Sequence, residues 1–218
     1  MKPERKIVLS IETAVEGGSI SVIEGKDEID FWIGNKEGLK AEDFLLEISK
    51  ILGKNKIGKK NIKSIIVSNG PGSSTGLKIG LATARGLGTA LNCEVIEISL
   101  LEAILKFVNI YENGKAFVIL PVSKNLFFLE KVKFVNLNTL KEFEETKALT
   151  IEKLIEELKL LSNIQIVIHR KVLESYNNLM SDSIKKSNKL IVFEENMAFI
   201  IAKKRIPNNA SDNIVYLE

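Results

Sequence analysis

The order in which the apolar spacing changes along the N-terminal half is the feature that most limits the fold of this chain. Short apolar or alternating segments with tight turns come first, and segments with the helical spacing of apolar residues follow. Strands joined by tight turns favour an antiparallel meander, whereas strands that alternate with helices favour parallel pairing. The expected strands are 6–11, 19–24, 28–33, 62–68 and 94–98, and the expected helices are 41–52, 75–91 and 100–108.

This order, βββαβαβα, is that of a ribonuclease-H-like domain, in which helices flank a mixed sheet. The second half follows a similar order less cleanly and shows no sequence repeat of the first. Its expected strands are 115–120, 126–135, 164–168 and 190–193, with helices at 150–161, 170–180 and 195–204. The polar segment 109–114 is the expected boundary, so we predict an α/β protein with two subdomains, 1–108 and 109–218.

Composition excludes several kinds of site. The 218 residues include one histidine, His169, and one cysteine, Cys93. A single cysteine forms no internal disulfide, and a single histidine excludes metal sites that need two or three imidazoles. No apolar run reaches the roughly 18 residues of a membrane-spanning helix or forms a signal-peptide core, so we expect a cytoplasmic protein that is independent of membranes.

The charge is nearly balanced, with 31 basic and 28 acidic residues, and only four of the basic residues are arginine. Arginine suits bases and phosphates better than lysine does, because its planar guanidinium can donate two hydrogen bonds at once. The sequence therefore does not indicate a dedicated RNA-reading surface. The densest basic cluster is 54–63, and a solvated loop is favoured there over a binding site.

The most informative local segment is the glycine-rich run 68–80, SNGPGSSTGLKIG. A strand enters the run, Gly70 and Gly72 allow unusual backbone angles, and Ser73 and Thr75 are suitable caps for the helix that follows. Free N–H groups at a helix start attract anions, so a phosphate site and a simple tight turn are both open, with the turn slightly favoured. The run is not a P-loop, because no Gly-Lys-Ser/Thr closes it.

The helix after this loop has an unusual composition. Gly76, Gly80 and Ala84 stand four residues apart, although each interior glycine costs about 1 kcal/mol relative to alanine. Close packing against another backbone would offset that cost. The spacing does not decide whether this backbone belongs to the same chain or to another protein.

Two segments resemble the TsaB (YeaZ) family, which acts in tRNA threonylcarbamoyladenosine biosynthesis. They are IVLSIETA at 7–14 and GPGSSTGLKIGLATARGL at 70–87, and Val215-Tyr216-Leu217 is similar to the family's closing motif. The chain departs from the family pattern at Glu12, Ser74 and Lys78, where the family has Asp, Phe and Arg. A second acidic strand end is absent from Leu120-Pro121-Val122-Ser123.

The resemblance implies an actin-like ATPase fold and a non-catalytic subunit that pairs with the TsaD enzyme for threonylcarbamoyl transfer to the adenosine adjacent to the tRNA anticodon. It also implies the ATPase TsaE as a partner, a homodimer when TsaD is absent, and contact with tRNA only through the complex. No cofactor is expected on this chain alone, and ATP or ADP is expected at the interface with TsaD. The implied phosphate-proximal residues are Glu12, Thr13, Gly70, Gly72, Ser73 and Thr75, and the implied partner interface is Leu45, Ile48, Gly76, Leu77, Gly80, Leu81 and Ala84.

The catalytic paralogue TsaD carries a His-x-x-x-His metal motif after the next strand, and here Leu100 and Ile104 align with those two positions. Neither side chain can ligate a metal, so we expect no metal site and no catalytic residue. The alternatives are a small-molecule kinase or ATPase of the same fold and, less favoured, a peptidase. A kinase would need acids at both strand ends for Mg²⁺, but Pro121 occupies the second, and the lone His169 is expected to be structural.

Overall fold

The computed structural model describes residues 5–15, 17–34, 41–108, 114–123, 125–134, 142–176, 179 and 181–205. The chain forms two compact units. The first contains the described residues up to Phe107 together with those from Glu195 onward, and the second contains the described residues between 108 and 194.

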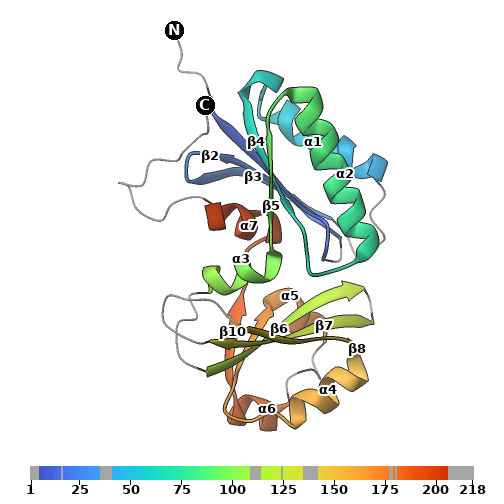
Figure 1. The fold of residues 1–218 in the computed structure, drawn as a ribbon, viewed down its shortest axis with the longest axis vertical. Helices are drawn as coiled ribbons and strands as arrows, with labels where there is room; N and C mark the ends of the chain where they lie inside the picture. Colours follow the sequence, from blue (N-terminus) through green and yellow to red (C-terminus); the bar gives the residue numbers. More distant parts are fainter. Residues whose placement is uncertain are drawn as a thin grey trace. The chain divides into compact units, whose positions relative to one another are not determined.

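The sheet of the first unit has the strand order β3-β2-β1-β4-β5 (Figure 1). Its strands are β1 Ile7–Glu12, β2 Ser19–Glu24, β3 Asp27–Ile33, β4 Ile62–Ser68 and β5 Glu94–Ile98. The first three pair antiparallel as a meander, while β1, β4 and β5 pair parallel. This is the predicted ribonuclease-H-like arrangement.

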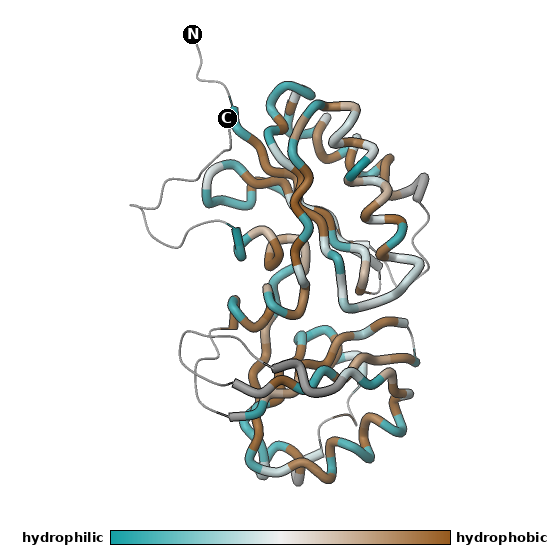
Figure 2. Tube along the Cα trace, viewed as in Figure 1, coloured by the Kyte–Doolittle hydropathy of each residue, from teal (hydrophilic) through white to brown (hydrophobic). Residues whose placement is uncertain are grey.

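Helices α1 (Ala41–Lys54) and α2 (Ser74–Leu91) lie side by side on one face of this sheet (Figure 1). The apolar period-two pattern of β1 supplies Leu9 and Ile11 to the core beneath them. Phe44 of α1 is fully buried and meets the Trp32 ring edge-on at 5.9 Å. The central strands β1 and β4 of this sheet are largely brown in Figure 2, as expected for strands with buried faces.

The opposite face of the first sheet receives α7 (Met197–Arg205), which packs against β1, β2, β4 and α3 (Leu100–Phe107). Buried serines on that face hydrogen-bond the helix start. Ser10 Oγ donates to the Ala198 carbonyl at 2.6 Å, and Ser19 Oγ accepts the Ala198 N–H at 3.0 Å. Asn196 Oδ1 accepts the Phe199 N–H at 2.8 Å and lies 2.9 Å from Ser21 Oγ.

The position of α7 corrects the predicted division of the chain. We expected residues 109–218 to form one C-terminal subdomain, but the chain returns to the first unit at Glu195. The reason is the polar stripe formed by Ser10, Ser19 and Ser21. Its buried hydroxyls need hydrogen-bond partners, and the N-terminal turn of α7 provides them.

The second unit repeats the topology of the first, with the strand order β10-β9-β6-β7-β8. Its strands are β6 Gly114–Ser123, β7 Leu126–Phe134, β8 Glu142–Thr150, β9 Gln165–His169 and β10 Lys189–Phe193, and its helices are α4 Ile151–Lys159, α5 Arg170–Ser175 and α6 Asp182–Ser187. Strands β6, β7 and β8 form an antiparallel meander, and β6, β9 and β10 pair parallel. Strand β8 and helix α6 were not predicted from the sequence.

Removing the Asn196 side chain tests the attachment of α7. Asn196→Ala should lower the free energy of unfolding by about 1–3 kcal/mol, because it removes the cap of α7 and leaves Ser21 and Glu28 without their amide partner. Urea denaturation measures the change. Ser162→Ala, at an exposed position, is the control and should change the value by less than about 0.5 kcal/mol. Equal stability of the two variants would contradict the prediction.

Candidate functional site

The carboxyl ends of β1 and β4 lie next to each other because the two strands pair parallel. The turn after β1 and the glycine-rich loop after β4 are directly bonded. Ser73 N–H donates to the Ala14 carbonyl at 2.7 Å, and Thr13 Oγ1 donates to the Gly76 carbonyl at 2.7 Å. The structure therefore brings the predicted phosphate-proximal residues of the two segments together.

Glu12 ends β1, and its side chain is buried, with 1% of its surface exposed. Its Oε1 accepts the N–H groups of Ala14 at 2.5 Å and Val15 at 3.1 Å, so the carboxyl caps the turn that follows its own strand. Burial raises the pKa of Glu12 to about 8, and the two N–H donors oppose this rise.

Several N–H groups of the glycine-rich loop are used within the chain. Gly70 N–H donates to Ser68 Oγ at 3.1 Å, and Gly76 N–H donates to Ser73 Oγ at 3.3 Å as the cap of α2. Together with the bond from Ser73 to Ala14, these contacts favour the tight-turn interpretation of the loop. Thr75, on the first turn of α2, is exposed. Nucleotide or phosphate binding at these residues stays a prediction.

The glycines of α2 make room for the rest of their own unit. A Cβ on Gly76 would stand within 3.0 Å of the Thr13 carbonyl oxygen, and one on Gly80 within 3.0 Å of Thr13 Oγ1. A Cβ on Gly88 would meet the Val95 side chain of β5 equally closely. The backbone that approaches Gly76 and Gly80 is that of the turn after β1, and a partner interface at these two residues stays a prediction.

The predicted interface set divides between interior and surface. Ile48, Gly80 and Ala84 are buried, Gly76, Leu77 and Leu81 are half-buried, and Leu45 is 46% exposed. Sequence reasoning missed the exposed Leu46, at 53%, and Gly86. Gly86 is an exposed interior glycine of α2, and no atom lies within 4 Å of a Cβ built there. Its exposure follows from the spacing, because Gly86 is two residues from the buried Ala84 and Gly88 and therefore lies on the opposite side of the helix.

Two other candidate side chains, His169 and Cys93, have structural roles in their own units. His169 Nδ1 accepts the Lys171 N–H at 3.1 Å as the cap of α5, which assigns the ring proton to Nε2, 3.2 Å from the Glu194 carbonyl. Burial raises the pKa of Cys93, which argues against an activated thiolate. This residue lies at a shallow hollow of about 480 Å³ that is lined by Arg85, Gly88, Thr89, Asn92, Cys93, Glu94 and Val95.

Glu130 of β7 is a buried carboxyl that the sequence analysis did not single out. It is 2% exposed, and its Oε2 accepts the Thr146 hydroxyl at 2.6 Å. Within the part of the chain that the structure describes, its Oε1 has no hydrogen-bond partner. Burial raises the pKa of this group. Its position in the middle of a mixed apolar and charged strand gave no signal in the sequence.

The described ranges contain neither a cluster of metal ligands nor a membrane-spanning helix. No group of three or more His, Cys, Asp or Glu side chains in these ranges is placed to hold a metal ion. Leu100 and Ile104 of α3 are fully buried, and the nearby Glu102 pairs with Lys204. None of the described helices combines the length and apolarity needed to cross a membrane.

Residues 40–173 match the family of tRNA N6-adenosine threonylcarbamoyltransferase, TsaD. The tRNA N6-adenosine threonylcarbamoyltransferase of Ehrlichia canis (strain Jake) is 26% identical over 139 residues, which are 56% of this chain and only 40% of that enzyme. The tRNA threonylcarbamoyladenosine biosynthesis protein TsaB of Buchnera aphidicola subsp. Baizongia pistaciae (strain Bp) is 30% identical over 165 residues, covering 68% of this chain and 72% of that protein. The structure of YeaZ from Pseudomonas aeruginosa superposes with a TM-score of 0.56 at 13% identity, over 90% of this chain and 89% of that one.

The two ribonuclease-H-like units define an actin-like fold. The match to TsaD places the chain in the class of proteins found in threonylcarbamoyladenosine biosynthesis. Within that class, the chain belongs to the TsaB (YeaZ) family.

Paired substitutions separate the inward glycines from the outward one. Gly80→Ala should lower the free energy of unfolding by about 1–3 kcal/mol, because the new methyl group meets Thr13 Oγ1. Gly86→Ala should raise it by up to about 1 kcal/mol, because alanine favours the helix and the methyl group meets nothing. Urea midpoints with unchanged slopes measure both effects. A Gly80→Ala protein as stable as the wild type would contradict the close approach of Thr13.

Glu12 should make stability depend on pH. Its pKa is about 8 in the folded chain and near its ordinary 4.5 when unfolded, so the folded state binds the proton more tightly. Stability is then full below about pH 4.5 and falls as the pH rises to about 8, by an amount on the order of 5 kcal/mol. Glu12→Gln keeps an oxygen for Ala14 and Val15 but cannot ionise, so it should remove this loss. Denaturant titrations from pH 5 to 9 measure it, with the exposed Glu156→Gln as the control. An unchanged pH profile in Glu12→Gln would refute the assignment.

Proposed function

We propose that this chain is a non-catalytic subunit that pairs with a TsaD enzyme, which transfers the threonylcarbamoyl group to the adenosine adjacent to the tRNA anticodon. The observation that carries the proposal is the match to a TsaB over most of both chains. Leu100 and Ile104 stand where TsaD enzymes carry two metal-binding histidines, and the whole chain has one histidine. The chemistry is therefore assigned to the partner.

The exposed residues of α1 and α2 supply the pairing surface in this proposal. Leu45 and Leu46 leave about half of their surface in solvent, which is more than core leucines of a helix normally leave. On α2, Ala82 and Gly86 are exposed, so little side-chain volume projects from the outer face of this helix. Small residues let two helix backbones approach closely, which gives Gly86 a role that packing within the unit does not give it.

The remaining partner assignments follow the same family. The ATPase TsaE would join the complex, ATP or ADP would bind at the joint with TsaD, and tRNA would be bound by the assembly. In the absence of TsaD, the same helices would pair two copies of this chain. The complex would work in the cytoplasm, where a half-buried Cys93 remains reduced.

Reconstitution with the TsaD enzyme of the same organism tests the proposal. The wild-type chain should form a complex and support tRNA modification. Gly86→Leu should weaken complex formation at least tenfold, because the long side chain separates the helices, while its stability stays equal or higher. Gly86→Ala is the matched control and should pair nearly normally. Titration calorimetry measures the pairing, and thermal unfolding measures the fold.

Normal pairing by Gly86→Leu would place the interface elsewhere. Failure of the wild-type chain to bind the enzyme or to support modification would refute the proposed function as a whole.

A further inference from the structure

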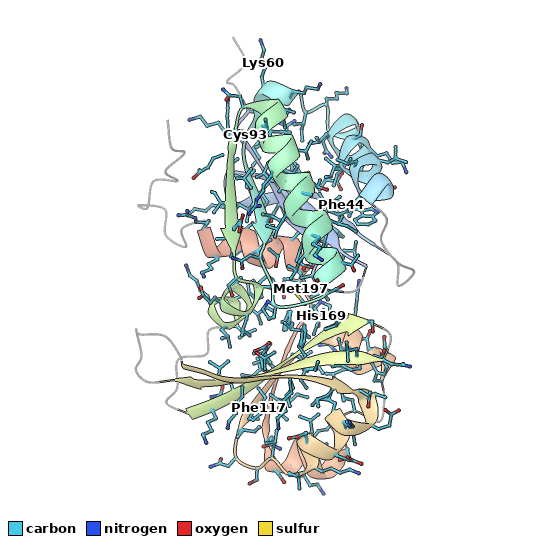
Figure 3. The ribbon with its side chains drawn as sticks, turned by 45° about the vertical axis from the view of Figure 1, so that its right-hand side comes forward. Phe44, Lys60, Cys93, Phe117, His169 and Met197 are labelled. Carbon is cyan, nitrogen blue, oxygen red and sulfur yellow. The ribbon has the colours of Figure 1, made fainter. Side chains whose placement is uncertain are left out.

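The turn that follows α1 carries the densest positive charge in the first unit. Residues 54–63 contain five lysines and no acidic residue. Lys54 pairs with Asp30 at 2.8 Å. The other exposed cations of this segment are Lys56, Lys59 and Lys60, which we call the lysine turn. Across the described ranges, no carboxylate forms an ion pair with these three side chains. This segment is largely teal in Figure 2, and Lys60 points away from the unit in Figure 3.

The backbone beneath the lysine turn is fixed by specific contacts. The Ile57 N–H donates to the Leu52 carbonyl at 2.9 Å, and the Lys56 N–H donates to the Gly53 carbonyl at 3.0 Å, which together form a Schellman cap of α1. Ile57 is buried in the core. Gly58 and Asn61 bond each other through the Asn61 side chain and backbone. The lysines therefore project from an ordered turn, so less conformational entropy is lost when they bind a partner.

Lys56 occupies a backbone position that disfavours it. Its φ of 53° lies in the left-handed region, and the residue at this place of a Schellman cap is usually glycine. Its side chain is exposed, and no intrachain contact of the described residues accounts for a lysine there. The charge itself is the property that glycine would lack.

We propose that the lysine turn binds the phosphodiester backbone of a structured RNA. This RNA is the tRNA substrate, an assignment that rests on the proposed function. Lysine ammonium groups attract phosphates as point charges, and the absence of arginine from 54–63 fits backbone contact without base reading. An anionic membrane is the less suitable partner, because the one large apolar residue between Lys56 and Lys60, Ile57, is buried and provides no anchor.

The test measures binding of an unmodified tRNA transcript to the reconstituted complex of the full chain with the TsaD enzyme, by fluorescence anisotropy at several salt concentrations. The triple variant Lys56→Glu, Lys59→Glu, Lys60→Glu should bind at least tenfold more weakly at about 50 mM salt. The slope of log affinity against log salt should become shallower by about two to three. The control is Lys153→Glu, Lys185→Glu, Lys186→Glu, which makes the same charge change at exposed positions of the second unit and should stay within twofold of the wild type.

Lys56→Gly separates charge from fold. The left-handed position favours glycine, so this variant should unfold at a temperature about 2–4 °C higher than the wild type. Its affinity for tRNA should nevertheless fall two- to fivefold. A purely structural residue would not move stability and binding in opposite directions.

Equal losses of tRNA affinity in the lysine-turn variant and its control would show that net charge alone sets the affinity, and would overturn the proposal. So would unchanged tRNA binding, or binding to anionic phosphatidylserine vesicles in place of tRNA. Complex formation with the TsaD enzyme is measured on the same variants. Intact pairing with unchanged tRNA affinity rejects the RNA contact alone, whereas failure of the wild-type chain to pair rejects the proposed function.

Discussion

The first unit depends on the close approach of the turn after β1 to the first turns of α2. Thr13 lies against Gly76 and Gly80 at distances that no Cβ allows, and its hydroxyl bonds the Gly76 carbonyl at 2.7 Å. The same approach seats Ala14 on the N–H of Ser73 and buries Glu12 beneath the turn. A loop with the composition of an anion cradle thus joins two segments of the unit, because the N–H groups of Gly70, Ser73 and Gly76 bond the chain itself.

Much of the first unit could be predicted from sequence because its signals are local. The strands β1, β4 and β5 and helix α2 follow from apolar period and from capping residues, and the structure confirms them. Strand β8 gave no such signal, because it is an edge strand rich in charged residues. The docking of α7 also could not be predicted, since the bond from Ser10 to Ala198 joins residues 188 positions apart.

The candidate site shows the same limit. Spacing identified Gly76 and Gly80 as positions of close approach, which the structure confirms, but it could not say what approaches them. The answer depends on where Thr13 is placed by the β1–β4 pairing, which is a tertiary property. Glu12 was found by its place at a strand end. Its burial and raised pKa depend on the turn folding back over it.

Two exposed positions remain that local energetics disfavour. Gly86 weakens a helix in which alanine would be better by about 1 kcal/mol, and Lys56 adopts a backbone angle that suits glycine. Inside the unit, unfavourable residues such as Gly80 are offset by packing. Gly86 and Lys56 have no such compensation among the described residues, so the compensation is expected outside the chain. Small side chains around Gly86 suit another helix, whereas the cations around Lys56 suit a polyanion, and the two surfaces therefore call for different partners.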